Sequence, residues 1–223
     1  MNKLEAIKKR HSVRSYTDEA ISAEEKRMLK IEIDACNREA GLHIQLILNE
    51  PDAFSGTMAK YGKFQAVNNY IAMIGKKGSE LEEKIGYFGE RIVIRAQQIG
   101  LNTCWVAMTY DKRMKKYDMN PGERLVCVIA VGHGSEQGEE HKSKPIERLC
   151  NYCKPMPEWF RKGMESAMLA PTAINQQRFL IIYEKGEVSA VAAGGMYSKL
   201  DLGIVKYHFE IGAAERIEWT IRK

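Results

Sequence analysis

Hydrophobic positions recur along the chain with two different periods, which predicts helices mixed with strands. Spacing of three or four residues is typical of amphipathic helices and occurs at 4–7, 22–36, 85–99, 156–169 and 202–213. Alternating or continuous apolar runs favour strands at 42–48, 70–74, 103–108, 125–131 and 179–183. We therefore predict an α+β fold, with a mixed sheet flanked by helices.

Local signals mark where several of these elements begin and end. Ser22 and Glu25 have the spacing of a helix-capping box, and Gly100 is placed to end the helix over 85–99. Asn120–Gly122 reads N-P-G and predicts a turn, while the polar, glycine-containing stretch 132–144 predicts a loop.

A faint internal repeat adds a second view of the chain. Residues 29–49 and 164–184 align without gaps as helix followed by strand, and 85–100 and 198–212 share helical length and an Ile-Gly ending. Helix-strand-helix units look alike by chance, so two readings stay open: coincidence, or two related halves.

Composition narrows the class of protein. The chain has 223 residues, 44% hydrophobic and 28% charged, which is ordinary for a soluble globular protein. The N-terminus lacks the apolar core of a signal peptide, and apolar runs are far shorter than a membrane span. Five cysteines, an odd count, favour reduced thiols. We expect a cytoplasmic protein with no membrane association.

Basic residues gather locally although the net charge is only +5. Clusters lie at 8–14, 112–116 and 141–148. They suit solvated surface or a small anionic ligand, because no duplex-binding motif accompanies them.

Arg10-x-Ser12-x-Arg14 is the first segment with readable chemistry. Two guanidinium groups and a hydroxyl lie where the chain leaves a short helix. Arginine binds phosphate oxygens bidentately and stays charged, so the segment suits a phosphate group; a plain surface cluster is the alternative.

The segment 170–177, A-P-T-A-I-N-Q-Q, is the second. Pro171 ends a helix, and Thr172, Asn175 and Gln176 then place neutral donors and acceptors in a loop beside the core. An uncharged, flat heterocycle fits such a loop, and a structural turn is the alternative.

Together these segments resemble the nitroreductase family. Its R-x-S-x-R motif matches Arg10–Arg14, its A-P-S-x-x-N-x-Q-P motif matches Ala170–Gln176, and its G-L-G-x-x-W stretch is similar to Gly100–Trp105. Its strand ending in G-Y/H before a basic pair is similar to Val131–Gly134 followed by His141–Lys144.

The resemblance implies FMN as cofactor and NAD(P)H as a transient co-substrate. It implies ping-pong transfer of two electrons to a small acceptor such as a nitroaromatic or quinone, without an acid–base residue of the protein. The cofactor-binding residues that it suggests are Arg10, His11, Ser12, Arg14, Thr103, Cys104, Trp105, His141, Lys142, Lys144, Ala170, Pro171, Thr172, Asn175 and Gln176.

One departure from the family pattern bears on assembly. Family members have the A-P-S-x-x-N motif after the first long helix, where this chain has the degenerate Ala35–Arg38. The resemblance therefore suggests that one chain mimics the family's dimer. Residues 1–150 would supply the phosphate site and 151–223 the ring-binding loop, with one FMN per chain; an ordinary homodimer is the alternative. The segments 52–63 and 191–199 are expected to act as lids.

Other functions compete with this one. Cys150-x-x-Cys153, with His133 and His141 upstream, could form half of a zinc site or a redox dithiol, although the histidine spacing is wide for zinc. No cysteine lies on a recognisable nucleophile turn, which disfavours a Cys–His hydrolase. An FMN carrier or sensor without catalysis and a nucleic-acid-binding module stay open.

Overall fold

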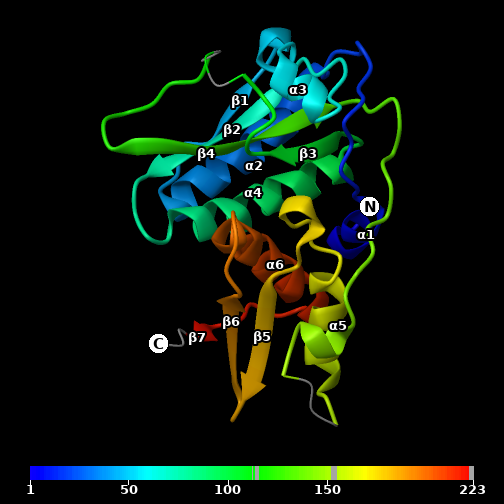
Figure 1. Cartoon of the computed structure of the whole chain (residues 1–223), viewed down its shortest axis with the longest axis vertical. Coiled ribbons are helices and arrows are strands. Elements are labelled where there is room, and N and C mark those ends of the chain that lie inside the picture. Colours follow the sequence, from blue (N-terminus) through cyan, green and yellow to red (C-terminus); the bar gives the residue numbers. More distant parts are fainter. Residues whose placement is uncertain (112, 114–115, 152–154, 221–223) are drawn as a thin grey trace. The chain divides into compact units, whose positions relative to one another are not determined.

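The computed structural model describes residues 1–111, 113, 116–151 and 155–220. The chain forms two compact units: unit 1 is Met1–Lys8, Glu82–Arg91 and His141–Lys223, and unit 2 is Lys9–Leu81 and Ile92–Glu140. Figure 1 shows the elements coloured along the sequence. Their bounds are α1 (Lys3–Lys9), α2 (Ala23–Ala40), β1 (Gln45–Ile47), η1 (Pro51–Phe54), α3 (Thr57–Tyr61), β2 (Tyr70–Lys76), α4 (Leu81–Gln98), β3 (Asn102–Val106), β4 (Glu123–Gly132), η2 (Ile146–Arg148), α5 (Glu158–Ala167), η3 (Ala173–Asn175), β5 (Phe179–Glu184), β6 (Glu187–Ala192), α6 (Ser198–Ala213) and β7 (Trp219–Thr220).

Unit 2 is built on a four-stranded antiparallel sheet in the order β1-β2-β4-β3. The central strands β2 and β4 pair along their length, with Tyr70 opposite Ala130 and a β-bulge between Met73 and Ile74. All residues of β2 except the last are buried. A strand covered on both faces needs the continuous hydrophobic run that this sequence has.

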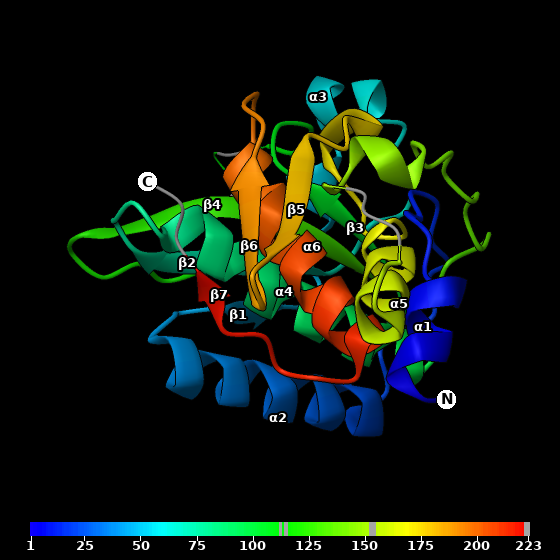
Figure 2. The same ribbon diagram turned by 90° about the horizontal axis from the view of Figure 1, so that it is seen from below.

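Different partners cover the two faces of this sheet. Tyr70 and Ile74 belong to a core cluster with Phe54 of η1 and other aromatic residues of the connections. Helix α2 lies along the other face (Figures 1 and 2). Its end is tied to the sheet because the side-chain amide of Asn37 bonds both the N–H and the carbonyl of Ile44.

Helix α6 forms the centre of unit 1, beside α5 and the sheet β5-β6-β7 (Figure 2). Glycines let its neighbours approach closely. A Cβ atom on Gly203 would lie 2.0 Å from the carbonyl oxygen of Glu83 in α4, and one on Gly86 would lie 2.0 Å from that of Leu200. Two helices therefore cross backbone to backbone at reciprocal glycines.

A fully buried polar pair links the same helices. His208 of α6 has Nδ1 3.1 Å from the Ser166 carbonyl oxygen of α5 and Nε2 2.8 Å from the Glu90 carboxyl of α4. A carbonyl only accepts hydrogen bonds, so Nδ1 carries a proton. Nε2 and the carboxyl of Glu90 therefore share a second proton.

Most elements predicted from the sequence are confirmed. Ser22 and Glu25 form the capping box, each side chain accepting from the other's backbone N–H. Gly100, with φ of 91°, follows the end of α4, and Gly122, with φ of 82°, lies in the turn before β4. The mixed α+β class is likewise confirmed.

The strand predicted at 42–48 is wrong in length and phase. β1 covers only Gln45–Ile47, and the buried residues Ile44 and Ile47 are three positions apart rather than two. Polar contacts explain the break: His43 Nδ1 lies 2.9 Å from a Glu123 carboxyl oxygen, and the Gln45 amide donates to the Asp118 carbonyl at 2.7 Å. These bonds fix side chains that a regular alternation would place otherwise.

Other elements differ from prediction at their limits. Helix α6 begins at Ser198 rather than at Leu202. The stretch 191–199, expected to be a lid, includes the end of β6 and the start of α6. Strands β6 and β7 and helix α3 have no counterpart among the predicted elements. Both units are discontinuous in sequence, whereas the predicted halves, 1–150 and 151–223, are continuous. An origin of the chain by duplication stays a prediction.

None of the helices in the described part of the chain has the length and apolarity that a membrane crossing requires.

Candidate functional site

The predicted phosphate segment lies beside strand β3 in unit 2. The Val13 N–H donates to the Thr103 carbonyl at 3.1 Å, and Ser12 forms a parallel bridge with Thr103. In an extended segment, alternate residues lie on one face. The R-x-S-x-R spacing is thus a strand period, which groups Arg10, Ser12 and Arg14.

The side chains of Arg10, Ser12 and Arg14 all act on the buried thiol of Cys104, which lies on β3. Burial raises the pKa of this thiol, and the nearby guanidinium groups of Arg14 and Arg10, with a hydrogen bond from Ser12, act in the opposite direction. Two positive charges and a hydroxyl therefore converge on one buried position. Arg10 is only 4% exposed, whereas Arg14 is exposed.

Of these three residues, Arg14 is best placed to bind an anion. Within the described ranges it makes no ion pair with a carboxylate. Its guanidinium can therefore donate two parallel hydrogen bonds to a phosphate. The donor set of this segment therefore fits a phosphate monoester.

The loop after β4 packs against the phosphate segment. The Gly134 N–H donates to the side-chain oxygen of Asn102 at 3.0 Å. A Cβ atom on Gly138, whose φ is 72°, would lie 2.9 Å from both the His11 Cβ and the Ser12 carbonyl oxygen. His11 and Ser12 are thus held between β3 and this loop, while Trp105 is half-buried two residues past Thr103.

The predicted ring-binding loop, 170–177, lies in unit 1 and has an unusual backbone. Ile174, Asn175 and Gln177 have φ of 48°, 54° and 45°. Left-handed backbone at residues other than glycine costs on the order of 1–3 kcal/mol each and persists only where surrounding contacts enforce it. The side chain of Ile174 is nevertheless 98% exposed, so this strained backbone holds an apolar side chain in solvent.

The basic segment His141–Lys144 packs against that loop. Lys144 Nζ donates to the carbonyls of Gln176 at 2.6 Å and Gln177 at 3.1 Å, and the Lys142 carbonyl accepts from the Asn175 amide at 3.0 Å. The ammonium of Lys144 therefore holds the loop. The binding of FMN by Lys142 or Lys144 stays a prediction.

Smaller contacts complete this arrangement. His141 Nε2 lies 3.0 Å from the carbonyl oxygen of Met168, at the end of α5. The Thr172 hydroxyl oxygen accepts the Gln177 N–H at 3.0 Å. Ala170 is buried and Pro171 is half-buried, so the start of the loop is anchored and its tip is exposed.

A carboxylate that the sequence analysis missed binds the loop from the side of α6. Asp201, 2% exposed, accepts the Ala173 N–H at 3.0 Å and the Gln176 side-chain N–H at 2.7 Å. Burial raises the pKa of Asp201 to about 6, against the opposing effect of these two bonds. The signal that could have revealed it is a single acid inside the apolar run L-D-L-G-I-V.

The predicted site residues therefore form two groups. Arg10, Ser12 and Arg14 lie with Cys104 in unit 2, and the 141–144 and 170–177 segments lie together in unit 1. Binding of one flavin by both groups stays a prediction.

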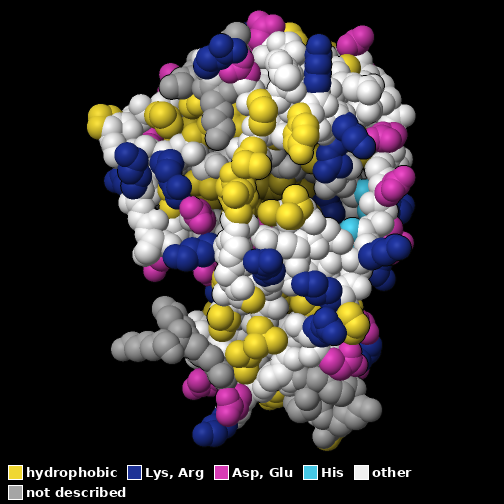
Figure 3. All heavy atoms as spheres, in the orientation of Figure 1, with side chains coloured by type: hydrophobic (Ala, Val, Ile, Leu, Met, Phe, Trp, Pro, Cys, Tyr) yellow, Lys and Arg dark blue, Asp and Glu magenta, His cyan; other side chains and the backbone are white. Residues whose placement is uncertain are grey.

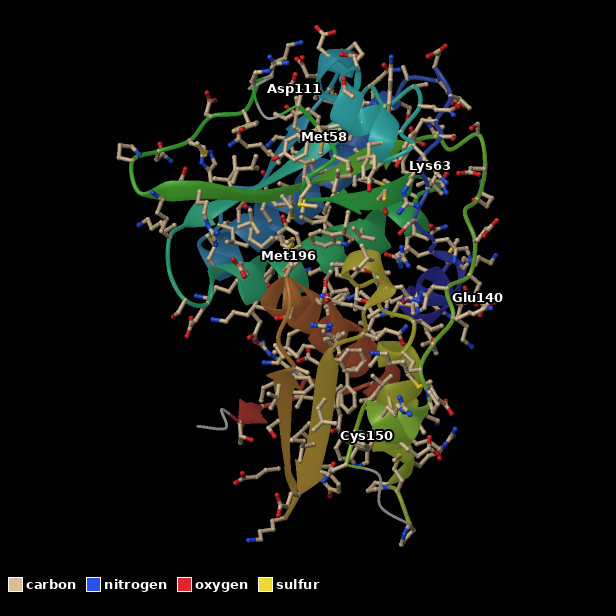
Figure 4. The ribbon with its side chains drawn as sticks, viewed as in Figure 1. Met58, Lys63, Asp111, Glu140, Cys150 and Met196 are labelled. Carbon is tan, nitrogen blue, oxygen red and sulfur yellow. The ribbon has the colours of Figure 1, made fainter. Side chains whose placement is uncertain are left out.

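Unit 2 also carries exposed apolar side chains. Met58 and Tyr61 of α3 are 48% and 83% exposed, and Met108, after β3, is 50% exposed. Figure 3 shows hydrophobic side chains gathered beside α3 and over the strands β3 and β4, and Figure 4 labels Met58 and Asp111 near α3. The Asp111 N–H donates to the Ala53 carbonyl at 2.8 Å, which ties this connection to η1. The segment 52–63 thus forms η1 and α3; its role as a lid stays a prediction.

The cysteine and metal alternatives gain no support from the described residues. No group of three or more His, Cys, Asp and Glu is placed there to hold a metal ion. Cys150 is buried (labelled in Figure 4), while Cys153 lies outside the described residues, as do 112, 114 and 115 of the basic cluster 112–116.

Comparison with protein families gives a match over almost the entire chain. A family model described as "Putative TM nitroreductase" matches residues 2–213. No match was found among curated proteins.

Solved structures agree in fold. A "putative nitroreductase" from Thermotoga maritima has a TM-score of 0.66 and 24% identity, covering 95% of this chain and 83% of its own. A "putative nitroreductase in complex with fmn" from Desulfovibrio desulfuricans has a TM-score of 0.54 and 19% identity, covering 70% and 99%. The NfrA1 nitroreductase from B. subtilis has a TM-score of 0.53 and 17% identity, covering 70% and 74%. At these identities the similarity shows a shared nitroreductase fold.

Proposed function

Because this chain belongs to the nitroreductase family described as "Putative TM nitroreductase", we propose that it is an FMN-dependent oxidoreductase. The observation that carries the proposal is the convergence of Arg10, Ser12 and Arg14 beside β3, with Arg14 making no ion pair within the described ranges. These are the donors that a phosphate monoester with about two negative charges requires. A structural relative whose printed name includes FMN supports the choice of cofactor.

Bound FMN would supply two-electron chemistry, taking hydride from NADH or NADPH and reducing a nitroaromatic, quinone or similar acceptor in a ping-pong cycle. The residues of this chain would bind and orient it. Arg10, Ser12 and Arg14 would hold the phosphate, and the 170–177 loop would contact the ring. No proton-transferring side chain is required in this scheme.

The neighbouring predicted residues have supporting roles in this proposal. Thr103 holds the phosphate segment through its backbone, and Cys104 and Trp105 follow on the same strand. His141 and Lys144 support the ring-binding loop. A cytoplasmic location and action as a monomer that mimics a dimer, with a homodimer as alternative, belong to the same proposal.

The test is a visible absorption spectrum of the purified protein before and after anaerobic addition of NADH and NADPH. We expect a flavin spectrum that bleaches. A flavin spectrum that persists would favour the second candidate, an FMN-binding carrier or sensor. A colourless protein that also fails to take up added FMN would contradict both; steeply salt-dependent oligonucleotide binding would then favour a nucleic-acid-binding module.

A further inference from the structure

The loop 170–177 cannot hold its conformation by local preference alone. Three of its residues, Ile174, Asn175 and Gln177, have φ between 45° and 54°, and Ile174 is β-branched. A β-branched residue in this region is a genuine outlier, since its branched Cβ crowds the backbone. The conformation therefore depends on contacts from outside the loop.

Two sets of contacts supply that support. On one side, Lys144 Nζ donates to the Gln176 and Gln177 carbonyls. On the other, the Asp201 carboxylate accepts from the Ala173 N–H, 3.0 and 3.2 Å from its two oxygens, and from Gln176 Nε2 at 2.7 Å. The ammonium of Lys144 thus binds carbonyl acceptors of the loop, and the carboxylate of Asp201 binds N–H donors of the loop.

The side-chain amides of Asn175 and Gln176, which the sequence analysis predicted to contact the ligand, donate their hydrogen bonds to groups that support the loop. Gln176 Nε2 donates to Asp201 and to the Met196 carbonyl at 2.9 Å, and Asn175 Nδ2 donates to the Lys142 carbonyl at 3.0 Å. Loss of the carboxylate would remove the bond of the Ala173 N–H and one of the two bonds of Gln176 Nε2. The loop would then lose its charged support on the side of α6 and keep the contacts from Met196, Lys142 and Lys144.

We propose that Asp201 is a positioning residue whose buried carboxylate holds the 170–177 loop in the conformation that receives the ring of FMN. This inference rests on the proposed function for the identity of the ligand and on the geometry of unit 1 for the loop. Asp201 acts through Ala173 and Gln176 and touches no reacting atom.

The protonation of Asp201 makes the proposal measurable. Its raised pKa of about 6 arises from burial, and the other contributors are the Gln176 and Ala173 bonds. The titratable groups on the elements that pack around the loop include Lys144 and His141 of the 141–144 segment, the exposed Lys199 of α6, and Lys206 of α6, which pairs with Glu83. Below pH 6 the carboxyl gains a proton and becomes a weaker acceptor for these two donors, so the loop should loosen locally. The same protonation removes a buried charge and therefore favours the folded chain as a whole.

Hydrogen–deuterium exchange of the flavin-free protein tests the structural step. Asp201→Asn keeps the size but turns one acceptor oxygen into an NH₂ group that opposes a donor. We expect amides within 171–177 to exchange about tenfold faster or more, because a charge-assisted bond is lost. Glu187→Gln removes an exposed carboxylate of the same unit and should leave this exchange unchanged. Exchange in Asp201→Asn that equals wild type would overturn the proposal.

FMN titration between pH 5 and 7.5 tests the functional step. We expect the wild-type dissociation constant to rise as pH falls through about 6, and that of Asp201→Asn to be about tenfold higher at pH 7.5. The dissociation constant of the variant should rise less steeply on acidification than that of wild type, because only protonation of the FMN phosphate, near pH 6, remains to weaken binding. Faster loop exchange without a change in FMN affinity would refute the link to the ring. If wild type binds no FMN at all, the proposed function fails and the ring-positioning step with it, while the exchange result still decides what Asp201 does to the loop.

Discussion

At the scale of single residues, substitutions of the two arginines of the phosphate segment would test phosphate binding with different clarity. Arg10 is buried beside Cys104, so its removal would also disturb packing. Arg14 is exposed and makes no ion pair in the described part of the chain. Arg14 is therefore the cleaner probe of phosphate binding.

Arg14→Ala is expected to weaken FMN binding about ten- to hundredfold, because a hydrogen bond to a charged group contributes about 1.5–3 kcal/mol. Thermal stability without FMN should change little, since the side chain is exposed. Fluorescence titration with FMN measures the first effect and a melting curve the second. Arg38→Ala, an exposed arginine on α2 of the same unit, serves as control. Wild-type affinity in Arg14→Ala would place the phosphate elsewhere.

Asp201 should also make stability depend on pH. Its pKa is about 6 in the folded chain and about 3.9 when unfolded, so between these values the folded state binds more protons. Its contribution to the free energy of unfolding is therefore complete below about pH 4 and is lost as pH rises through 6, by roughly 3 kcal/mol at most. Urea titrations of flavin-free protein at pH 4.5 and 7.5 measure the difference. Asp201→Asn should show a smaller difference than wild type, and equal differences would contradict the assignment.

At the residue level, a motif that combines residue type with spacing predicted which side chains lie together, while their binding of a phosphate stays a prediction. Arg10, Ser12 and Arg14 converge because their period matches extended backbone. Asp201 was missed because its partners, Ala173 and Gln176, lie 28 and 25 positions away. The apolar run L-D-L-G-I-V around it indicates a buried acid, but nothing local identifies the two donors that its carboxylate binds.

At the scale of elements, the crossing of α4 and α6 depends on two glycines. A methyl group on Gly203 would lie 2.0 Å from the backbone oxygen of Glu83, which cannot rotate away. Gly203→Ala is expected to destabilise the protein by about 3 kcal/mol or to prevent folding, since overpacking against backbone forces the helices apart. Gly78→Ala, where a Cβ would meet nothing within 4 Å, is the control. Urea denaturation measures both, and a wild-type midpoint for Gly203→Ala would show that the helices do not cross there.

The buried pair of Glu90 and His208 joins the same helices by polar contact. Removing one partner leaves the other buried without its bond, which costs about 3–5 kcal/mol for such pairs. Glu90→Ala should therefore unfold at much lower urea concentration than wild type, while Glu147→Ala, an exposed acid of the same unit, should not. A double-mutant cycle with His208→Ala should give non-additive losses; additive losses would mean that the two side chains do not interact.

Elements were predictable where one period ran unbroken, as in α2, α4 and β4. The strand prediction for 42–48 was wrong because His43 and Gln45 form hydrogen bonds with Glu123 and Asp118, which lie more than seventy positions away in the sequence. Strand β7 consists of Trp219 and Thr220 only and exists through its pairing with β6. Elements that short depend on tertiary partners, which no local pattern encodes.

At the scale of the whole molecule, sequence order and spatial grouping diverge. Unit 1 draws on three separate stretches, including Glu82–Arg91 from the middle of the chain. Helix α4 is one continuous helix whose residues belong to both units. Because a continuous helix has no compositional break, a division between units that runs through α4 leaves no signal in the sequence.

The count of phosphate segments leads to the last prediction, the flavin content per chain. The sequence holds a single R-x-S-x-R, at Arg10–Arg14, and a single well-matched A-P-T-x-x-N loop, at 170–175. One FMN per chain is therefore expected, whether the protein acts alone or as a homodimer. A chain that mimics the family's dimer should have a solution mass near 25.4 kDa, and a homodimer twice that. Light scattering after size exclusion, combined with flavin absorbance, measures both quantities on one sample. Two flavins per chain would require a second phosphate site and would contradict the expectation of one FMN per chain, whereas a doubled mass with one flavin per chain would reject only the monomer.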